Sequence, residues 1–209
     1  MPIKAYCINL DERKDRWESF ITQPIGIPVE RFSAVKRDKG NEGCLLSHLG
    51  VMRKCEDEVL IFEDDCKLLQ PWSVFERAYR QLPKSWDALW LGANVITPLK
   101  RYSENLFRLQ SGWTTHGILW KKKIIDKILT DGFDTIIKYK NFDTYLARVI
   151  QPKFNCYIIY PCFATQSTSF SDIVHYDRDY TIIESNFTKN TTNGFCTHSK
   201  HLWAGGFPA

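Results

Sequence analysis

Three consecutive carboxylates close an apolar run in the stretch VLIFEDDC, residues 59–66. Four apolar residues in a row are typical of a strand buried on both faces, so Glu63, Asp64 and Asp65 come where that strand ends. Adjacent like charges repel one another, and the arrangement becomes useful if a positive group lies between them. Carboxylate oxygens are the ligands of hard divalent cations, which typically bridge to a phosphate. The alternative is that the acids cap the helix expected near Pro71.

The elements that would position these acids alternate between strand-like and helix-like patterns. Strands are expected at about 3–10, 29–35, 59–66 and 87–95, with helices at about 11–21, 43–56 and 71–83 between them. Two short strands about a turn (106–120), a helix ending at Gly132, a short helix (141–150) and a last strand (156–161) follow. This rhythm predicts an α/β fold with a mostly parallel, twisted sheet flanked by helices. Ligands bind at the carboxyl ends of strands in such sheets, which is where the acids lie.

Composition narrows the classes of function. A hydrophobic content of 44% supports a folded core, and we expect one domain over residues 1–209, irregular from about 163 onward. The net charge of +4 permits anionic substrates but is too small to predict nucleic-acid binding. The seven cysteines include no Cys-x-x-Cys pair, which is typical of reduced thiols in a cytoplasmic protein. Neither a signal peptide nor a membrane-spanning run is visible, and peripheral membrane contact stays open.

Phosphate recognition would have to come from isolated bases. No Gly-x-x-x-x-Gly-Lys-Ser/Thr or Gly-x-Gly-x-x-Gly motif occurs. The phosphate-binding loops typical of nucleoside triphosphate hydrolysis and of dinucleotide binding are therefore missing from the sequence. Arg13 and Arg16 repeat at i, i+3 on one face of the first expected helix, so both side chains can point to a pyrophosphate. Surface ion pairs with neighbouring acids are the alternative for both. Arg31 is a further isolated base.

Four motifs, in this order and spacing, resemble the pattern of glycosyltransferase family 25. They are INLDERKDRWESF (8–20), RFSAV (31–35), GCLLSHLGVMRKC (43–55) and VLIFEDDC (59–66), followed by looser matches at DALWLGANV, GWTTHGILW, NFDTYL and QSTSFSDI. The GCLLSH element close before FEDDC is the most specific of them. The family contains bacterial lipooligosaccharide galactosyltransferases and the galactosyltransferase domain that modifies collagen hydroxylysine, and large DNA viruses also carry members.

The resemblance implies a GT-A-like fold, a nucleotide-sugar donor and inversion at the anomeric carbon. Glu63 and Asp65 become the outer members of an acid-x-acid motif that holds Mn²⁺ or Mg²⁺ against the donor diphosphate, with Asp172 and His175 as further ligands. The donor-binding residues that the resemblance implies are Asn9, Leu10, Arg13, Arg16, Ser47, His48, Asp64, His116, Gly117 and Gln166. Each has an ordinary structural alternative: turn residues in the loops, surface ion pairs for the arginines, and a core group for the helical histidine.

Asp143, in NFDTYLARV, is the expected general base. Inverting transfer is a direct displacement, so the acceptor hydroxyl must lose its proton on the face opposite the leaving diphosphate. The metal-binding acids lie on the leaving-group side, and Asp143 matches the position where the family carries an acid at the head of a short helix. The alternative is a helix cap.

The function we expect is therefore metal-dependent transfer of a hexose, galactose by the resemblance, from a UDP-sugar to an acceptor hydroxyl on a glycan or a hydroxylysine-type side chain. Two other classes stay open. One is a metal-dependent phosphohydrolase that uses the same acids, although the chain lacks the further His and Asp clusters that most such sites need. The other is a non-catalytic saccharide-binding module on a degenerate transferase fold.

Overall fold

A central sheet of eight strands organises the chain. The computed structural model describes residues 3–167, 169–170, 177–178 and 181–192. The sheet consists of β1 (Lys4–Asn9), β2 (Glu30–Ser33), β3 (Glu58–Glu63), β5 (Ala88–Trp90), β7 (Lys100–Arg101), β8 (Leu106–Arg108), β10 (Gly117–Lys121) and β11 (Cys156–Ile159). Their order is β2-β1-β3-β10-β5-β11-β8-β7. All run in one direction except β10 and β8.

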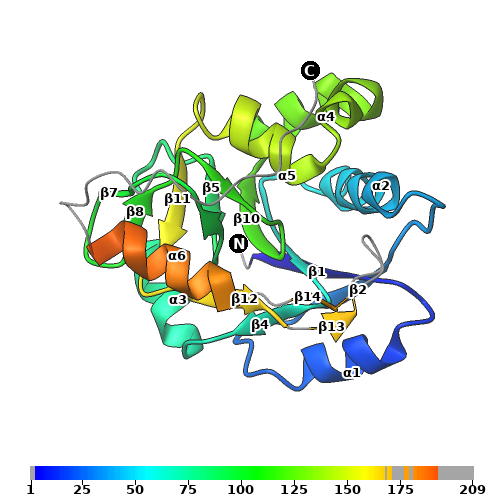
Figure 1. Ribbon diagram of the computed structural model, residues 1–209, viewed down its shortest axis with the longest axis horizontal. Coiled ribbons are helices and arrows are strands. Elements are labelled where there is room, and N and C mark those ends of the chain that lie inside the picture. Colours follow the sequence, from blue (N-terminus) through cyan, green and yellow to red (C-terminus); the bar gives the residue numbers. More distant parts are fainter. Residues whose placement is uncertain (1–2, 168, 171–176, 179–180, 193–209) are drawn as a thin grey trace.

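Helices cover both faces of this sheet (Figure 1). One layer consists of α2 (Gly40–Met52), α4 (Lys122–Ile136) and α5 (Phe142–Tyr145), with the 3₁₀ turn η1 (Ile137–Tyr139) and the π-helical turn η2 (Leu146–Ile150). The opposite layer consists of α1 (Lys14–Ile21) and α3 (Trp72–Arg80). The α/β fold with a mostly parallel sheet flanked by helices is therefore confirmed, and it is the class expected of a GT-A-like fold. None of the helices in the described residues is both long and apolar enough to span a membrane.

Strand β3 shows why the sequence folds in this way. Val59 and Ile61 belong to one core cluster, whereas Leu60 and Phe62 belong to the cluster on the other face. All four side chains are fully buried. Because successive side chains of a strand point to opposite faces, a strand covered by helices on both sides must be apolar throughout. The acids can begin only where this double burial ends.

Three short strand pairs complete the fold. They are β4 (Cys66–Leu68) with β12 (Ala164–Gln166), β6 (Asn94–Val95) with β9 (Gly112–Trp113), and β13 (Ser169–Phe170) with β14 (Asp177–Arg178). The single strand expected over 87–95 is thus divided into β5 and β6. Gly92 lies in the interruption between the two strands. A Cβ at this position would lie 1.8 Å from the Ala164 carbonyl oxygen, so only glycine fits.

Two other details differ from the sequence expectation. Gly132 does break α4, with φ 67° and ψ 176°, but a further helical turn follows to Ile136. In the C-terminal extension, expected to be irregular, residues Thr181–Thr192 form helix α6. Ile183 and Phe187 of α6, one helical turn apart, are buried in the same core cluster as α2 and α4. The extension therefore supplies part of the core.

Candidate active site

The acid triplet lies at the edge of the sheet where the parallel strands β1, β2 and β3 end. Ile8 of β1 is opposite Glu63, and the Asp64 N–H donates to the Ile8 carbonyl at 3.2 Å. The Glu63 N–H donates to the carbonyl of His116, just before β10, at 2.9 Å. Strand β4 separates the acids from α3, whose N-cap is Pro71, so the helix-capping alternative is wrong. The acids occupy the edge at which α/β sheets bind ligands.

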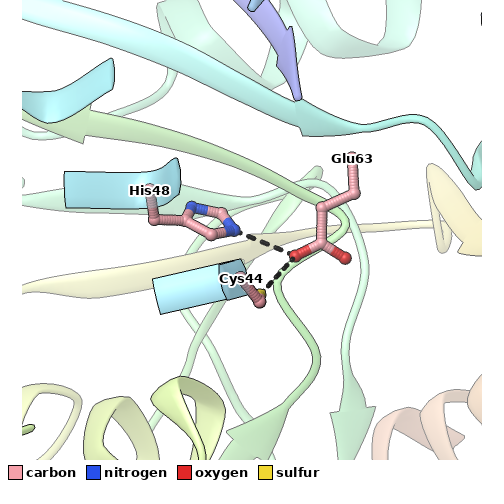
Figure 2. A group of neighbouring side chains, drawn as sticks. All are labelled: Cys44, His48 and Glu63. Carbon is pink, nitrogen blue, oxygen red and sulfur yellow. Dashed lines mark hydrogen bonds and ion pairs between the residues drawn. The ribbon is translucent and has the colours of Figure 1, made fainter. Parts of the chain in front are cut away.

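Glu63 is held by three donors that converge on one of its carboxylate oxygens, and Figure 2 shows two of them, Cys44 and His48. His48 Nε2 lies 2.9 Å from Oε1, the Thr115 hydroxyl donates to the same oxygen at 2.6 Å, and Cys44 Sγ lies 3.8 Å away. Burial acts to raise the pKa of Glu63, but the hydrogen bond and charge of His48 and the Thr115 hydroxyl outweigh it, and the pKa is lowered. Glu63 is therefore a carboxylate whose orientation is fixed by α2 and by the segment before β10.

Asp64 is bound by two side chains of the N-terminal region. Its Oδ2 accepts from the Asn9 amide at 2.7 Å and its Oδ1 from the Arg16 guanidinium at 3.2 Å. The side chains of Arg16 and Asp64 are only 14% and 9% exposed, so this ion pair belongs to the packed edge and not to the surface. Arg31 in turn donates to Asn9 Oδ1 at 2.7 Å. The network connects the acid triplet to α1 and β2.

Asp65 has one satisfied oxygen and one without a partner. Its Oδ2 accepts from the Gln166 amide of β12 at 3.0 Å, and its backbone carbonyl accepts the Ser167 N–H at 2.7 Å. Its Oδ1 is buried and has no hydrogen-bond partner in the described part of the chain. Burial, and then the charges of Glu63 and Asp64, raise the pKa of Asp65 to about 8. A buried carboxyl oxygen in negative surroundings suits a hard cation, because oxygen is the ligand such ions prefer.

Asp143, the expected base, lies in the first turn of α5. Its carboxylate accepts the backbone N–H groups of Thr144 and Thr114, and the Thr144 hydroxyl lies 3.3 Å from Oδ1. Burial raises the pKa of Asp143, and the charge of Glu63 raises it further, which places the two acids in one electrostatic neighbourhood. A raised pKa brings a carboxylate closer to the working pH of a general base.

The contact between Thr114 and Asp143 depends on a strained backbone. Thr114 has φ 82°, in the left-handed region that β-branched residues rarely adopt, and its buried hydroxyl has no partner in the described residues. Such a conformation costs about 1–3 kcal/mol and persists only where the surroundings enforce it. Two residues earlier, the backbone of Gly112 is fixed by two hydrogen bonds of 2.8 Å to the amide of Gln151.

Several predicted donor-binding residues make structural contacts next to the acids. Arg13 donates to both carboxylate oxygens of Asp15 at 3.2 Å, as the ion-pair alternative expects. The Leu10 carbonyl accepts the Arg13 N–H at 2.9 Å. The Ser47 hydroxyl donates to a carbonyl one helical turn earlier at 2.7 Å and accepts the Val35 N–H at 2.8 Å. These contacts fix the loops that border the site, and a role in donor binding remains a prediction.

His116 and Gly117 lie in the packed interior behind the acids. His116 is fully buried, its Nε2 lies 3.3 Å from the Ala164 carbonyl oxygen, and burial lowers its pKa to about 4 against the opposing charge of Glu63. Gly117 begins β10, where a Cβ would lie 3.1 Å from a Leu91 methyl group. Both residues therefore pack in the interior, behind the sheet edge that carries the acids. The remaining predicted metal ligands, Asp172 and His175, lie outside the described residues.

The structure also brings in residues that sequence reasoning did not assign. Cys44 lies one helical turn before His48 in the same motif, so helical spacing could have indicated that both reach the same group. Thr114 and Thr115 carry no comparable signal, because their contacts to Asp143 and Glu63 depend on the position of β10 in the sheet. A cavity of about 380 Å³ adjoins this edge and is lined by Asn9, Asp11, Lys14, Trp17, Glu18 and Arg31.

Comparison with known proteins supports the fold. No family profile and no curated protein matches the sequence. A197 from STIV is structurally similar, with a TM-score of 0.51 and 13% identity over 81% of this chain and 87% of that protein. Weaker matches include the inositol-1-phosphate CTP transferase from T. maritima (TM-score 0.46, 11% identity, 90% and 78% of the two chains). A mutant of Drosophila β-1,4-galactosyltransferase 7 with manganese, UDP-Gal and xylobiose also matches (TM-score 0.41, 9% identity, 96% and 78%).

Proposed function

We propose that this protein is a metal-dependent inverting glycosyltransferase related to glycosyltransferase family 25. It would move a hexose, galactose in our proposal, from a UDP-sugar to a hydroxyl group of a glycan or of a hydroxylysine-type side chain. The observation that carries the proposal is the convergence of acids from two distant segments. Glu63, Asp64 and Asp65 end a buried strand, and Asp143 comes from α5 with a pKa that responds to the charge of Glu63.

Asp65 is the residue that fits a divalent cation best. Its buried Oδ1 lacks a partner among the described residues, and its pKa is raised to about 8 by burial and by the charges of the two neighbouring acids. Asp65, with Glu63 beside it, would hold Mn²⁺ or Mg²⁺ through oxygen ligands. When bound, the ion would neutralise the negative charge that develops on the departing diphosphate.

The cavity beside Asn9 is the place we propose for the nucleotide part of the donor. Its volume of about 380 Å³ lies in the range of small-molecule sites. The Trp17 indole offers an aromatic face for a base, and Lys14 and Arg31 offer cationic groups for phosphate or ribose oxygens. Asn9 borders the cavity and donates to Asp64 at 2.7 Å, so a nucleotide bound there adjoins the acid triplet.

Asp143 is the group we assign to the acceptor hydroxyl. A neutral hydroxyl is a poor nucleophile, and a positioned base that takes its proton contributes about 10²–10⁴-fold in rate. The two N–H groups that Asp143 accepts, from Thr144 and Thr114, hold the carboxylate in one orientation. It comes from the helical layer of α5 and not from β3, so the base and the leaving-group acids are supplied by different elements.

The test is an assay of donor turnover by the purified protein. UDP-galactose, UDP-glucose and other nucleotide sugars are supplied without acceptor, with Mn²⁺ or with a chelator, and release of UDP and free sugar is followed. We expect slow, Mn²⁺-dependent hydrolysis of one donor, faster with a glycan or hydroxylysine acceptor. Release of phosphate from simple esters would indicate a phosphohydrolase instead, and sugar binding without turnover would indicate a non-catalytic module.

A pair of variants connects that activity to the site. Asp65→Asn should remove the metal-dependent turnover. Asp126→Asn, on the exposed side of α4 where the acid pairs with Lys122, should leave turnover unchanged, because exposed ion pairs contribute little. Equal activity of the two variants would contradict the proposed site.

A further inference from the structure

Two side chains of α2 reach the same carboxylate oxygen of Glu63. Cys44 and His48 are four residues apart in the helix, which places them on one face. The Sγ atom of Cys44 lies 3.8 Å and the Nε2 atom of His48 lies 2.9 Å from Glu63 Oε1, and Figure 2 shows the three side chains turned toward one another. Within the described residues, these three ligand atoms all lie within 4.8 Å of one another.

This geometry is close to that of a tetrahedral metal site. Zinc bonds are about 2.3 Å to sulfur and about 2.0–2.2 Å to nitrogen or oxygen, so two ligand atoms of one ion lie about 3.3–3.8 Å apart. The separation between Cys44 and Glu63 already meets this requirement, and that between His48 and Glu63 needs to widen by only about half an ångström. The third pair of ligand atoms, Cys44 Sγ and His48 Nε2, lies within 4.8 Å and would have to approach to the same range.

The ligand chemistry differs from that of Asp65. A thiolate and an imidazole select zinc and other borderline ions, whereas Mn²⁺ and Mg²⁺ prefer oxygen. We infer that Cys44, His48 and Glu63 form a binding site for Zn²⁺ or a chemically similar ion such as Co²⁺, distinct from the oxygen-ligand site at Asp65. Three protein ligands leave the fourth tetrahedral position to a water molecule.

The protons balance in a simple way. Zn²⁺ replaces the thiol proton of Cys44, which is released to solvent. His48 must present an unprotonated Nε2 to the ion, so its ring proton is carried by Nδ1, a buried atom that has no partner among the described residues. Glu63 binds the ion as a carboxylate and loses no proton. The Thr115 hydroxyl, 2.6 Å from Oε1, does not bind the ion itself but keeps the Glu63 carboxylate in its orientation.

The zinc site and the proposed catalytic metal site both use Glu63, so zinc should affect activity. This consequence rests on the proposed function. Glu63 is one of the two acids that we assign to the Mn²⁺ or Mg²⁺ of the transfer reaction. When Zn²⁺ binds Glu63, the catalytic ion loses this ligand. Zinc should therefore inhibit Mn²⁺-dependent turnover through Cys44 and not through general competition.

The experiment titrates the reduced, metal-free, full-length protein with Co²⁺. We expect one equivalent to produce the visible bands of tetrahedral cobalt and a near-ultraviolet thiolate-to-cobalt band, both removed when Zn²⁺ is added. Cys44→Ser should abolish the thiolate band, and His48→Gln should weaken binding at least about 100-fold, since even outer-partner changes cost about 10–100-fold. Cys55→Ser, at a buried cysteine outside the cluster, is the matched control and should bind like the wild type.

X-ray absorption at the zinc edge gives an independent measurement, with one sulfur expected at about 2.3 Å. A wild-type protein without the thiolate band, or a Cys44→Ser variant that keeps it, would overturn the inference. Melting of each variant without metal is the control for folding, and Cys44→Ala replaces Cys44→Ser if the latter is unstable. If the protein binds cobalt as expected but turns over no nucleotide sugar, only the proposed function fails.

Discussion

Strand β3 carries an acid at each end, and the two ends of the strand surround their acids differently. At the amino end, Glu58 accepts the Tyr79 hydroxyl at 2.7 Å and pairs with Lys121 at 2.8 Å. Nearby, the buried Asp87 pairs with Lys123 at 3.0 Å and accepts a backbone N–H. Each acid at this end of the strand has a lysine, so the charges are neutralised by the protein itself.

At the carboxyl end, only one of four acids has such a partner. Asp64 pairs with Arg16, whereas Glu63, Asp65 and Asp143 make no ion pair with lysine or arginine in the part of the chain that the structure describes. Acids held together without a basic partner destabilise the fold or retain a proton, as the raised pKa of Asp65 indicates, unless a cation binds them. We infer that the first group of acids has a structural role, and our proposal assigns the second group to binding.

The largest effect is expected on turnover, and it should distinguish the carboxyl end of β3 from its amino end. Asp65→Ala should reduce transfer at least about 10³-fold, because a catalytic cation supplies several kcal/mol, while the melting temperature holds or rises as repulsion is relieved. Glu58→Ala should do the opposite: activity is kept, and about 1–3 kcal/mol of stability is lost with the Tyr79 and Lys121 contacts. Turnover and thermal melting of both variants test this, and a destabilised, active Asp65→Ala protein would break the comparison.

Asp143→Asn should lower turnover at least about 100-fold, since asparagine can still accept a hydrogen bond and cap the helix but cannot take a proton. Donor affinity, measured by calorimetry, and melting temperature should stay near the wild-type values. If Asp143→Asn keeps its turnover and Asp143→Ala melts at a lower temperature, Asp143 is a helix cap. The acids at the carboxyl end of β3 would then include one with a structural role.

Arg16→Ala should weaken UDP binding by about 1.5–3 kcal/mol if the guanidinium contacts the diphosphate through a charge-assisted hydrogen bond. Arg13→Ala is the matched variant on the same helix face, with its pair to Asp15 instead of the acid triplet, and its effect should be smaller. Calorimetry with UDP and Mn²⁺ measures both. Unchanged affinity in the two variants would mean that Arg16 pairs with Asp64 but does not contact the diphosphate.

The smallest effect is expected at the amino end. Asp87→Asn keeps the acceptor for the Asn155 N–H but removes the ion pair with Lys123, whose side chain is 70% exposed. Because the Lys123 side chain stays largely in water, the pair contributes little, and stability should fall by only about 1 kcal/mol, with no change in turnover. Denaturant unfolding measures this loss. A change in turnover would mean that the two ends of the sheet are coupled.

Local patterns were sufficient to predict the frame of this site. The apolar run of β3 indicated double burial, and the carboxylates after Phe62 had to lie at the sheet edge for that reason. A helix was likewise predicted over residues 43–56, and Leu45 and Leu49 of the observed helix α2 are buried in the core. Both predictions depend on periodicity, which a single segment contains in full.

The partners of the acids could not be predicted in the same way. Thr115 reaches Glu63 across 52 residues of sequence, and Gln166 reaches Asp65 across 101. These contacts follow from sheet order and register, which no single segment specifies. Helix α6 was missed because its polar composition hides the two residues, Ile183 and Phe187, that pack into the core.

The pairing of β12 with β4 has a consequence for the order in which the protein matures. The acids of β3 are synthesised early, but Gln166 and Ser167, which hold Asp65, come about a hundred residues later. During synthesis the amino-terminal part of a chain emerges first. The Asp65 carboxylate of a nascent chain therefore stays unanchored until β12 has docked, and activity should begin only after Gln166 and Ser167 have been synthesised.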